Sequence, residues 1–148
     1  MITEEMQNEK MCLFCASDYH LEMILLPYIT ERIDNSKFII FTENNLEESI
    51  DVLLTKVNLN GEIKEKIKRL NWENNDNFKF KVLEENIQEN LKIIINGRLN
   101  YINSINNSIK NLINDNVKII DCFHVGDSDI DIEEISNNYT FVLNTQKI

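Results

Sequence analysis

The densest run of residues that could do chemistry is His-Val-Gly-Asp-Ser-Asp-Ile-Asp at positions 124–131. An apolar segment ends there in Gly-Asp, and Asp131 follows Asp127 by four positions. Carboxylate oxygens are the ligands that Mg²⁺ prefers, so Asp127 and Asp131 are candidate metal ligands. The alternative is that Ser128 or Asp129 caps a short final helix, whose positive N-terminal end favours the nearby carboxylates. The sequence leaves both interpretations open.

This acidic run resembles the fourth motif of haloacid dehalogenase-type phosphohydrolases. The apolar segment that ends in Thr42 is similar to that family's second motif, in which a hydroxyl group binds phosphate. The resemblance implies a phosphohydrolase that depends on Mg²⁺. The family's nucleophile is the first Asp of an Asp-x-Asp at the end of the first strand, where this chain has Cys-Ala-Ser-Asp at 15–18. An enzyme of this type would therefore need Asp18 as an unconventional third carboxylate.

Candidate ligand-binding residues follow from where open α/β sheets hold ligands, beyond the carboxyl ends of the strands and beside helix N-termini. That rule selects Asp18, Tyr19, His20, Thr42, Glu43, Arg98 and Asp127. The sequence has no phosphate-cradling loop, no dinucleotide-binding glycine turn and no Gly-x-Ser-x-Gly nucleophile elbow. We therefore expect no resident cofactor and name no catalytic residue, with Mg²⁺ reserved for the hydrolase alternative.

The cysteines suggest buried free thiols in a reducing compartment. Cys12 and Cys15 match a Cys-x-x-Cys pattern, but residues three apart in a strand point to opposite faces of the sheet. A thioredoxin-like site would require a helix to begin at Cys15 instead. With Cys122 the count is odd and the surroundings are apolar. This favours free thiols in the reducing cytoplasm over a framework of disulfide bonds.

Charge and hydropathy narrow the classes of partner. A net charge of −10 over 148 residues disfavours nucleic acid and anionic membranes, since binding to either depends on Lys and Arg. No apolar run approaches the ~20 residues that cross a bilayer, and the first residues are acidic where a signal peptide would be basic. Six of the 15 cations lie in 64–81, which indicates a solvated helix or a docking surface for an acidic partner.

Strands and helices alternate along the chain. Apolar runs predict strands at 10–16, 37–42, 91–96, 117–125 and 140–144, and alternating Phe and Lys predict an edge strand at 78–82. Helical spacing of apolar residues predicts helices between them, the first capped by Ser17 or Asp18 and kinked or broken near Pro27. We expect one domain over 1–148, a Rossmann-like three-layer α/β/α sandwich whose mostly parallel sheet has five or six strands.

The segment 11–43 resembles the opening of the MEDS sensory domain, with an apolar strand, a Leu-Pro-Tyr step in the helix and then Lys-Phe-Ile-Ile-Phe-Thr-Glu. That domain is similar to RecA-type ATPases but lacks their phosphate loop, so the resemblance implies a non-catalytic sensor. Together with the missing catalytic signatures, it favours a cytoplasmic module that binds a small molecule or a protein. His20, Arg98 and Asp127 are expected near the ligand, and a second copy of the chain is a candidate partner.

Overall fold

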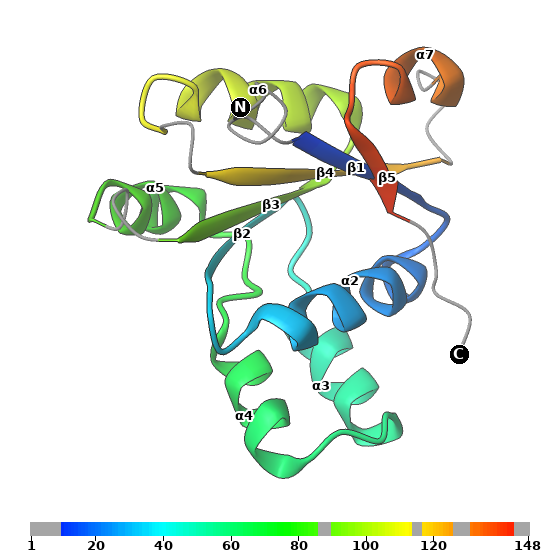
Figure 1. The fold of residues 1–148 in the computed structure, drawn as a ribbon, viewed down its shortest axis with the longest axis vertical. Helices are drawn as coiled ribbons and strands as arrows, with labels where there is room; N and C mark the ends of the chain where they lie inside the picture. The colour runs from blue at the N-terminus through cyan, green and yellow to red at the C-terminus, as the bar shows by residue number, and fades with distance from the viewer. Residues whose placement is uncertain (1–9, 86–89, 114–116, 126–130, 144–148) are drawn as a thin grey trace, which may run out of the picture.

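The computed structural model describes residues 10–85, 90–113, 117–125 and 131–143. In this part of the chain one sheet holds five parallel strands in the order β2-β3-β4-β1-β5 (Figure 1). The strands are β1 (Lys10–Cys15), β2 (Lys37–Thr42), β3 (Leu91–Gly97), β4 (Lys118–His124) and β5 (Phe141–Leu143). The predicted α/β class and parallel sheet are confirmed.

Helices cover both faces of the sheet, and an apolar cluster lies under each layer (Figure 1). One face carries α2 (Asp18–Arg32), α3 (Glu47–Lys56) and α4 (Gly61–Arg69). The other carries α5 (Asp76–Glu85), α6 (Leu99–Ile109) and α7 (Ile132–Ser136). Cys15 belongs to the first cluster and Cys12 to the second, which confirms that the two thiols face opposite sides of β1. All three cysteines are buried and free.

The start of α2 is fixed by Ser17, whose hydroxyl accepts a hydrogen bond from the backbone N–H of His20 at 3.1 Å. This confirms the predicted cap. The expected break at Pro27 is absent: α2 continues through that residue as one helix to Arg32.

The predicted strand at 78–82 is wrong, since these residues lie inside α5. The alternating pattern assumed that both lysines point to solvent, yet Lys79 is only 2% exposed. Its ammonium donates to the carbonyl of Glu73, and Leu83, one turn later, is buried with it. The inward residues therefore follow helical spacing, with Phe80 packed against Phe41 of β2.

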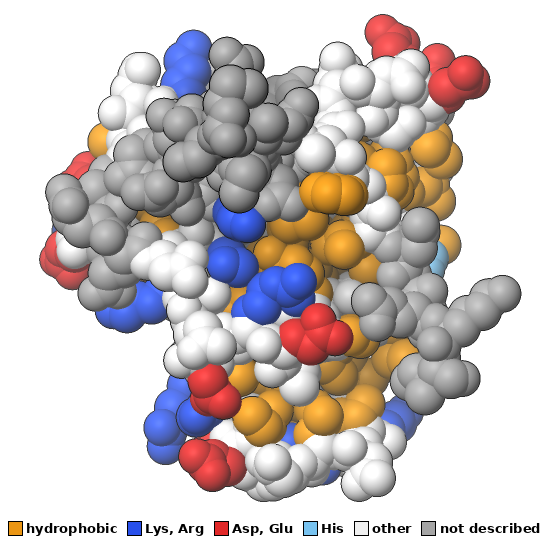
Figure 2. Space-filling model, in the orientation of Figure 1, with side chains coloured by type: hydrophobic (Ala, Val, Ile, Leu, Met, Phe, Trp, Pro, Cys, Tyr) orange, Lys and Arg blue, Asp and Glu red, His pale blue; other side chains and the backbone are white. Residues whose placement is uncertain are grey.

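The basic stretch 64–81 does not form a single basic surface. On α4, Lys66 pairs with Asp34 and, at 3.7 Å, with Glu62. Figure 2 shows basic and acidic side chains next to one another where α4 lies, and Lys79 is buried on the other face of the sheet. The solvated-helix interpretation fits these pairs.

The strand order places a topological switch point at the carboxyl ends of β1 and β4, and we name this position the crevice between β1 and β4. The chain leaves β1 through α2 and crosses beneath β4 and β3 to β2, whereas it leaves β4 through α7 on the opposite face and crosses β1 to β5. Neighbouring strands whose connections depart in opposite directions leave a gap at their carboxyl ends, where ligands of such sheets bind. No helix within the described ranges has the length and apolarity needed to span a membrane.

Candidate functional site

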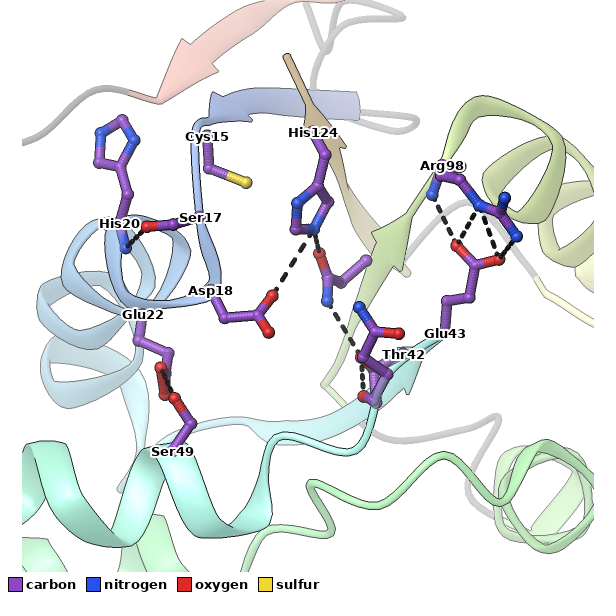
Figure 3. A network of polar contacts seen from close by, with 12 residues as sticks. Cys15, Ser17, Asp18, His20, Glu22, Thr42, Glu43, Ser49, Arg98 and His124 are labelled. Carbon is purple, nitrogen blue, oxygen red and sulfur yellow. Dashed lines mark hydrogen bonds and ion pairs between the residues drawn. The ribbon is translucent and has the colours of Figure 1, made fainter. Parts of the chain in front are cut away.

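A row of polar side chains crosses the carboxyl ends of three neighbouring strands. Thr42 of β2 is paired in register with Asn96 of β3, and His124 ends β4 (Figure 3). Strand alternation places all three on the α2 side of the sheet, where the preceding side chains on that face, Ile40 and Ile94, are fully apolar. Thr42 and Asn96 are 0% and 1% exposed, so the row interrupts an otherwise apolar layer.

One chain of hydrogen bonds joins this row. Thr42 Oγ1 donates to the carbonyl of Asn44 at 2.6 Å and accepts from Asn96 Nδ2 at 3.0 Å. The carboxamide oxygen of Asn96 is then left to face His124 Nε2, 2.8 Å away. Since an amide oxygen can only accept, the direction of the chain assigns the hydrogen to Nε2 of His124.

Asp18 brings a carboxylate to the same place from the first turn of α2. Its Oδ1 lies 3.9 Å from His124 Nε2, so a charged imidazole would form an ion pair there. The side chains of Asp18 and His124 are 38% and 21% exposed, whereas Asn96 behind them is buried. Asp18 and His124 thus bring a carboxylate and an imidazole together at the switch point between β1 and β4 (Figure 3).

Glu43 and Arg98 form a second polar pair, after β2 and β3. The backbone N–H of Arg98 donates to Glu43 Oε1 at 2.9 Å, and its guanidinium donates to Oε2 at 2.7 Å. These bonds lower the pKa of the Glu43 carboxyl. A Cβ at Gly97 would lie 2.8 Å from Tyr101 Cδ2 and 2.9 Å from Glu43 Cβ, so only glycine leaves room for this pair.

Cys15 lies beside the crevice but is not activated. Burial, and then the charge of Asp18, raise the pKa of its thiol to about 12. Its sulfur is the donor to the carbonyl of Phe123 at 3.6 Å, and the residue is fully buried. A nucleophilic cysteine needs a thiolate near neutral pH, which this environment opposes.

The remaining residues selected from the sequence lie elsewhere. The ring of His20 points away from Asp18 and His124, and its Nδ1 accepts from the backbone N–H of Ala16 at 3.0 Å. It is therefore not brought to the crevice. Tyr19 is 55% exposed and lines a separate hollow between α2 and α3.

Of the two candidate metal ligands, Asp127 lies outside the described residues. Asp131 is the N-cap of α7, and its Oδ1 accepts from the backbone N–H of Glu134 at 3.1 Å. The final helix is therefore capped at Asp131, not at Ser128 or Asp129 as the sequence suggested. Over the described ranges, no three His, Cys, Asp or Glu side chains are grouped to hold a metal ion.

A buried carboxylate on the opposite face of the sheet gives a useful contrast. Asp121 of β4 is 0% exposed and accepts hydrogen bonds from Tyr139 and from Asn106 Nδ2 at 3.1 Å, while Lys10 Nζ lies 3.4 Å away. These partners come from α6, from β1 and from the segment after α7. Asp121 therefore ties elements together in the interior, whereas the side chains of Asp18 and His124 are partly exposed to solvent.

Sequence reasoning missed Asn96 and undervalued His124. Both lie at or next to the carboxyl end of a largely apolar strand, and both fall on the same face as Thr42 once the register is known. The available signal was a polar residue closing each apolar run, which also fits a simple strand terminus. Only the strand order brings the three together.

Comparisons with protein-family models, with curated proteins and with solved structures found no match to this chain.

Proposed function

We propose that the protein is a non-catalytic binding module, of sensory or regulatory type, that holds a small polar molecule in the crevice between β1 and β4. The observation that carries this proposal is the buried hydrogen-bond chain from Thr42 through Asn96 to His124, which ends beside Asp18. Apolar residues would pack these strand ends without any need for paired polar groups. The polar row instead fixes the orientation of one imidazole at the switch point of the sheet.

The chemistry of the crevice favours a ligand rich in hydrogen-bond donors. The carboxylate of Asp18 accepts hydrogen bonds, and the carboxamide oxygen of Asn96 is already used by His124. A hydroxyl or N–H group of the ligand would donate to Asp18 beside the imidazole. Arg98 is held by Glu43 and so would contribute less than the sequence suggested.

The thiol and hydroxyl groups near the crevice suit binding without catalysis. Cys15 is an inert thiol, and Ser17 is used as the cap of α2. The three free buried thiols suit a reducing compartment such as the cytoplasm. A sensor of this kind would pass ligand occupancy to a protein partner, with α2 as the element that the ligand contacts first.

Native mass spectrometry of the full chain, purified under mild conditions, tests the proposal. We expect an added small-molecule mass that denaturation releases and that Asp18→Asn and His124→Phe each reduce, while Glu84→Gln, on the far face of the sheet, retains it. An unliganded wild type that also shows no thermal shift with amino acids, nucleosides or sugars would overturn the proposal. Turnover of p-nitrophenyl phosphate that requires Mg²⁺ and is lost in Asp127→Asn would establish the hydrolase alternative instead.

A further inference from the structure

A hollow of about 390 Å³ opens between the start of α2 and the outer side of α3. Its volume falls in the range of small-molecule sites, about 300–1,000 Å³. Neither Asp18 nor His124 lines it, so it is separate from the crevice between β1 and β4. The residues that define its chemistry are Tyr19, Asn45, Glu48, Ser49, Val52 and Lys56.

Ser49 makes the wall of this hollow selective for donors. Its hydroxyl donates to Oε1 of Glu22 at 2.5 Å, so its only hydrogen is committed behind the wall. A hydroxyl in this state presents lone pairs alone to whatever occupies the hollow. Ser49 Oγ can therefore accept a hydrogen bond from an N–H group. It has no hydrogen left to donate to a carbonyl or carboxylate oxygen.

Glu22 strengthens that preference from behind. The residue is 1% exposed, and its Oε2 has no hydrogen-bond partner in the described part of the chain. A buried carboxyl that is short of donors is costly, and a positive charge placed one hydrogen bond away would offset that cost. Burial also raises the pKa of Glu22, as expected for a carboxyl without enough partners.

The rest of the hollow suits an apolar body that carries one positive charge. Tyr19 and Val52 are 55% and 49% exposed, which is unusual for large apolar side chains, and the Tyr19 ring can hold a cation over its face. Glu48 adds an exposed carboxylate. Lys56 follows Glu48 by eight positions, roughly 12 Å along the helix, and repels a second cation there.

We propose that this hollow binds a small primary monoamine, whose ammonium group donates to Ser49 and Glu48 and whose apolar body lies against Tyr19 and Val52. The site does not depend on the crevice between β1 and β4. Its occupant differs from a polyamine, which would bring a second charge toward Lys56, and from a carboxylic acid, which Ser49 and Glu48 would reject.

The test is an NMR titration of the isotope-labelled full chain at neutral pH with three probes: phenethylamine, phenylpropionate and spermidine. We expect phenethylamine to shift the amide signals of Tyr19, Ser49 and Val52 saturably, and the other two probes to bind at least about tenfold more weakly. Equal binding of phenylpropionate, stronger binding of spermidine, or no shift with phenethylamine would overturn the proposal.

Two variants assign the effect to named groups. Glu22→Gln keeps the size of the side chain and an acceptor for Ser49 but removes the buried carboxyl, and Glu48→Gln changes an exposed residue in the first turn of α3. We expect each to weaken phenethylamine binding several-fold, with Glu84→Gln on α5 as the control that leaves it unchanged. Unchanged affinity in both Glu22→Gln and Glu48→Gln would contradict the proposed contacts.

Discussion

His124 Nε2 lies 2.8 Å from the carboxamide oxygen of Asn96, across two neighbouring parallel strands at their carboxyl ends. Asn96 is buried and His124 is partly exposed, so the bond runs from the interior to the crevice. Because Asn96 is held in turn by Thr42, the orientation of this β4 imidazole is set by residues of β3 and β2. A rigid imidazole is what a binding site needs, since an orienting group that is already ordered costs less entropy when a ligand binds.

Asn96→Leu should destabilise the fold by about 1–3 kcal/mol, because it leaves the Thr42 hydroxyl and the His124 N–H without their buried partner. Thr42→Val should cost less, since it removes one end of the chain only. If the three side chains act as one network, combining Asn96→Leu with Thr42→Val will lower the free energy of unfolding by clearly less than the sum of the two single losses. Urea denaturation midpoints measure this, and additivity within about 0.3 kcal/mol would contradict the network.

Glu43→Gln should remove part of the acid sensitivity of the fold. Arg98 lowers the pKa of Glu43 in the folded state, so the pair stabilises the fold above the ordinary carboxyl value of 4.5 and loses this effect as the pH falls through the lowered value. The guanidinium is largely exposed, so the contribution should stay below about 1 kcal/mol. The measurement is the difference in unfolding free energy between wild type and variant, followed from neutral to acidic pH. A difference that does not shrink on acidification would contradict the assignment.

Lys79→Met should stabilise the protein by about 1–3 kcal/mol near neutral pH. Burial lowers the pKa of Lys79 from 10.5 to about 8, so between these values the unfolded chain binds more protons and the stability of the wild type rises with pH. Below about 8 both states are charged and the full cost of burial is present. Thermal melts across this range should show that the gain in stability of the variant over the wild type shrinks as the pH increases. A destabilised variant would show that the hydrogen bond to Glu73 outweighs the cost of burying the ammonium.

The cysteines should resist thiol reagents while the protein is folded. Burial raises the pKa of Cys12 to about 11 and of Cys15 to about 12, and it raises that of Cys122 as well. Ellman's reagent at neutral pH should label them only as fast as the fold opens, and completely in urea. Rapid labelling of native Cys15 would revive a redox role at the crevice.

The hydropathy pattern of the sequence was sufficient to predict the parallel sheet, but it was not sufficient to predict the candidate site. The apolar runs that became β2, β3 and β4 need no knowledge of their neighbours, because a strand covered on both faces must be apolar almost throughout. The strand prediction at 78–82 failed because Lys79 buries its long side chain. A pattern of polar and apolar residues treats every lysine as pointing to solvent. The contact between Asn96 and His124 depends on strand order, and no local pattern carries that information.

A small polar ligand in the crevice between β1 and β4, as we propose, should be detectable in solution. The most direct measurement is an NMR titration of the isotope-labelled full chain with a small-molecule extract of the cells that express it, following the imidazole nitrogens of His124 and the backbone amides of Asp18 and Asn96. We expect these signals to shift together and saturably, and Asp18→Asn to abolish the shift. Signals that stay unchanged at all three residues, or that shift equally in Asp18→Asn, would contradict it.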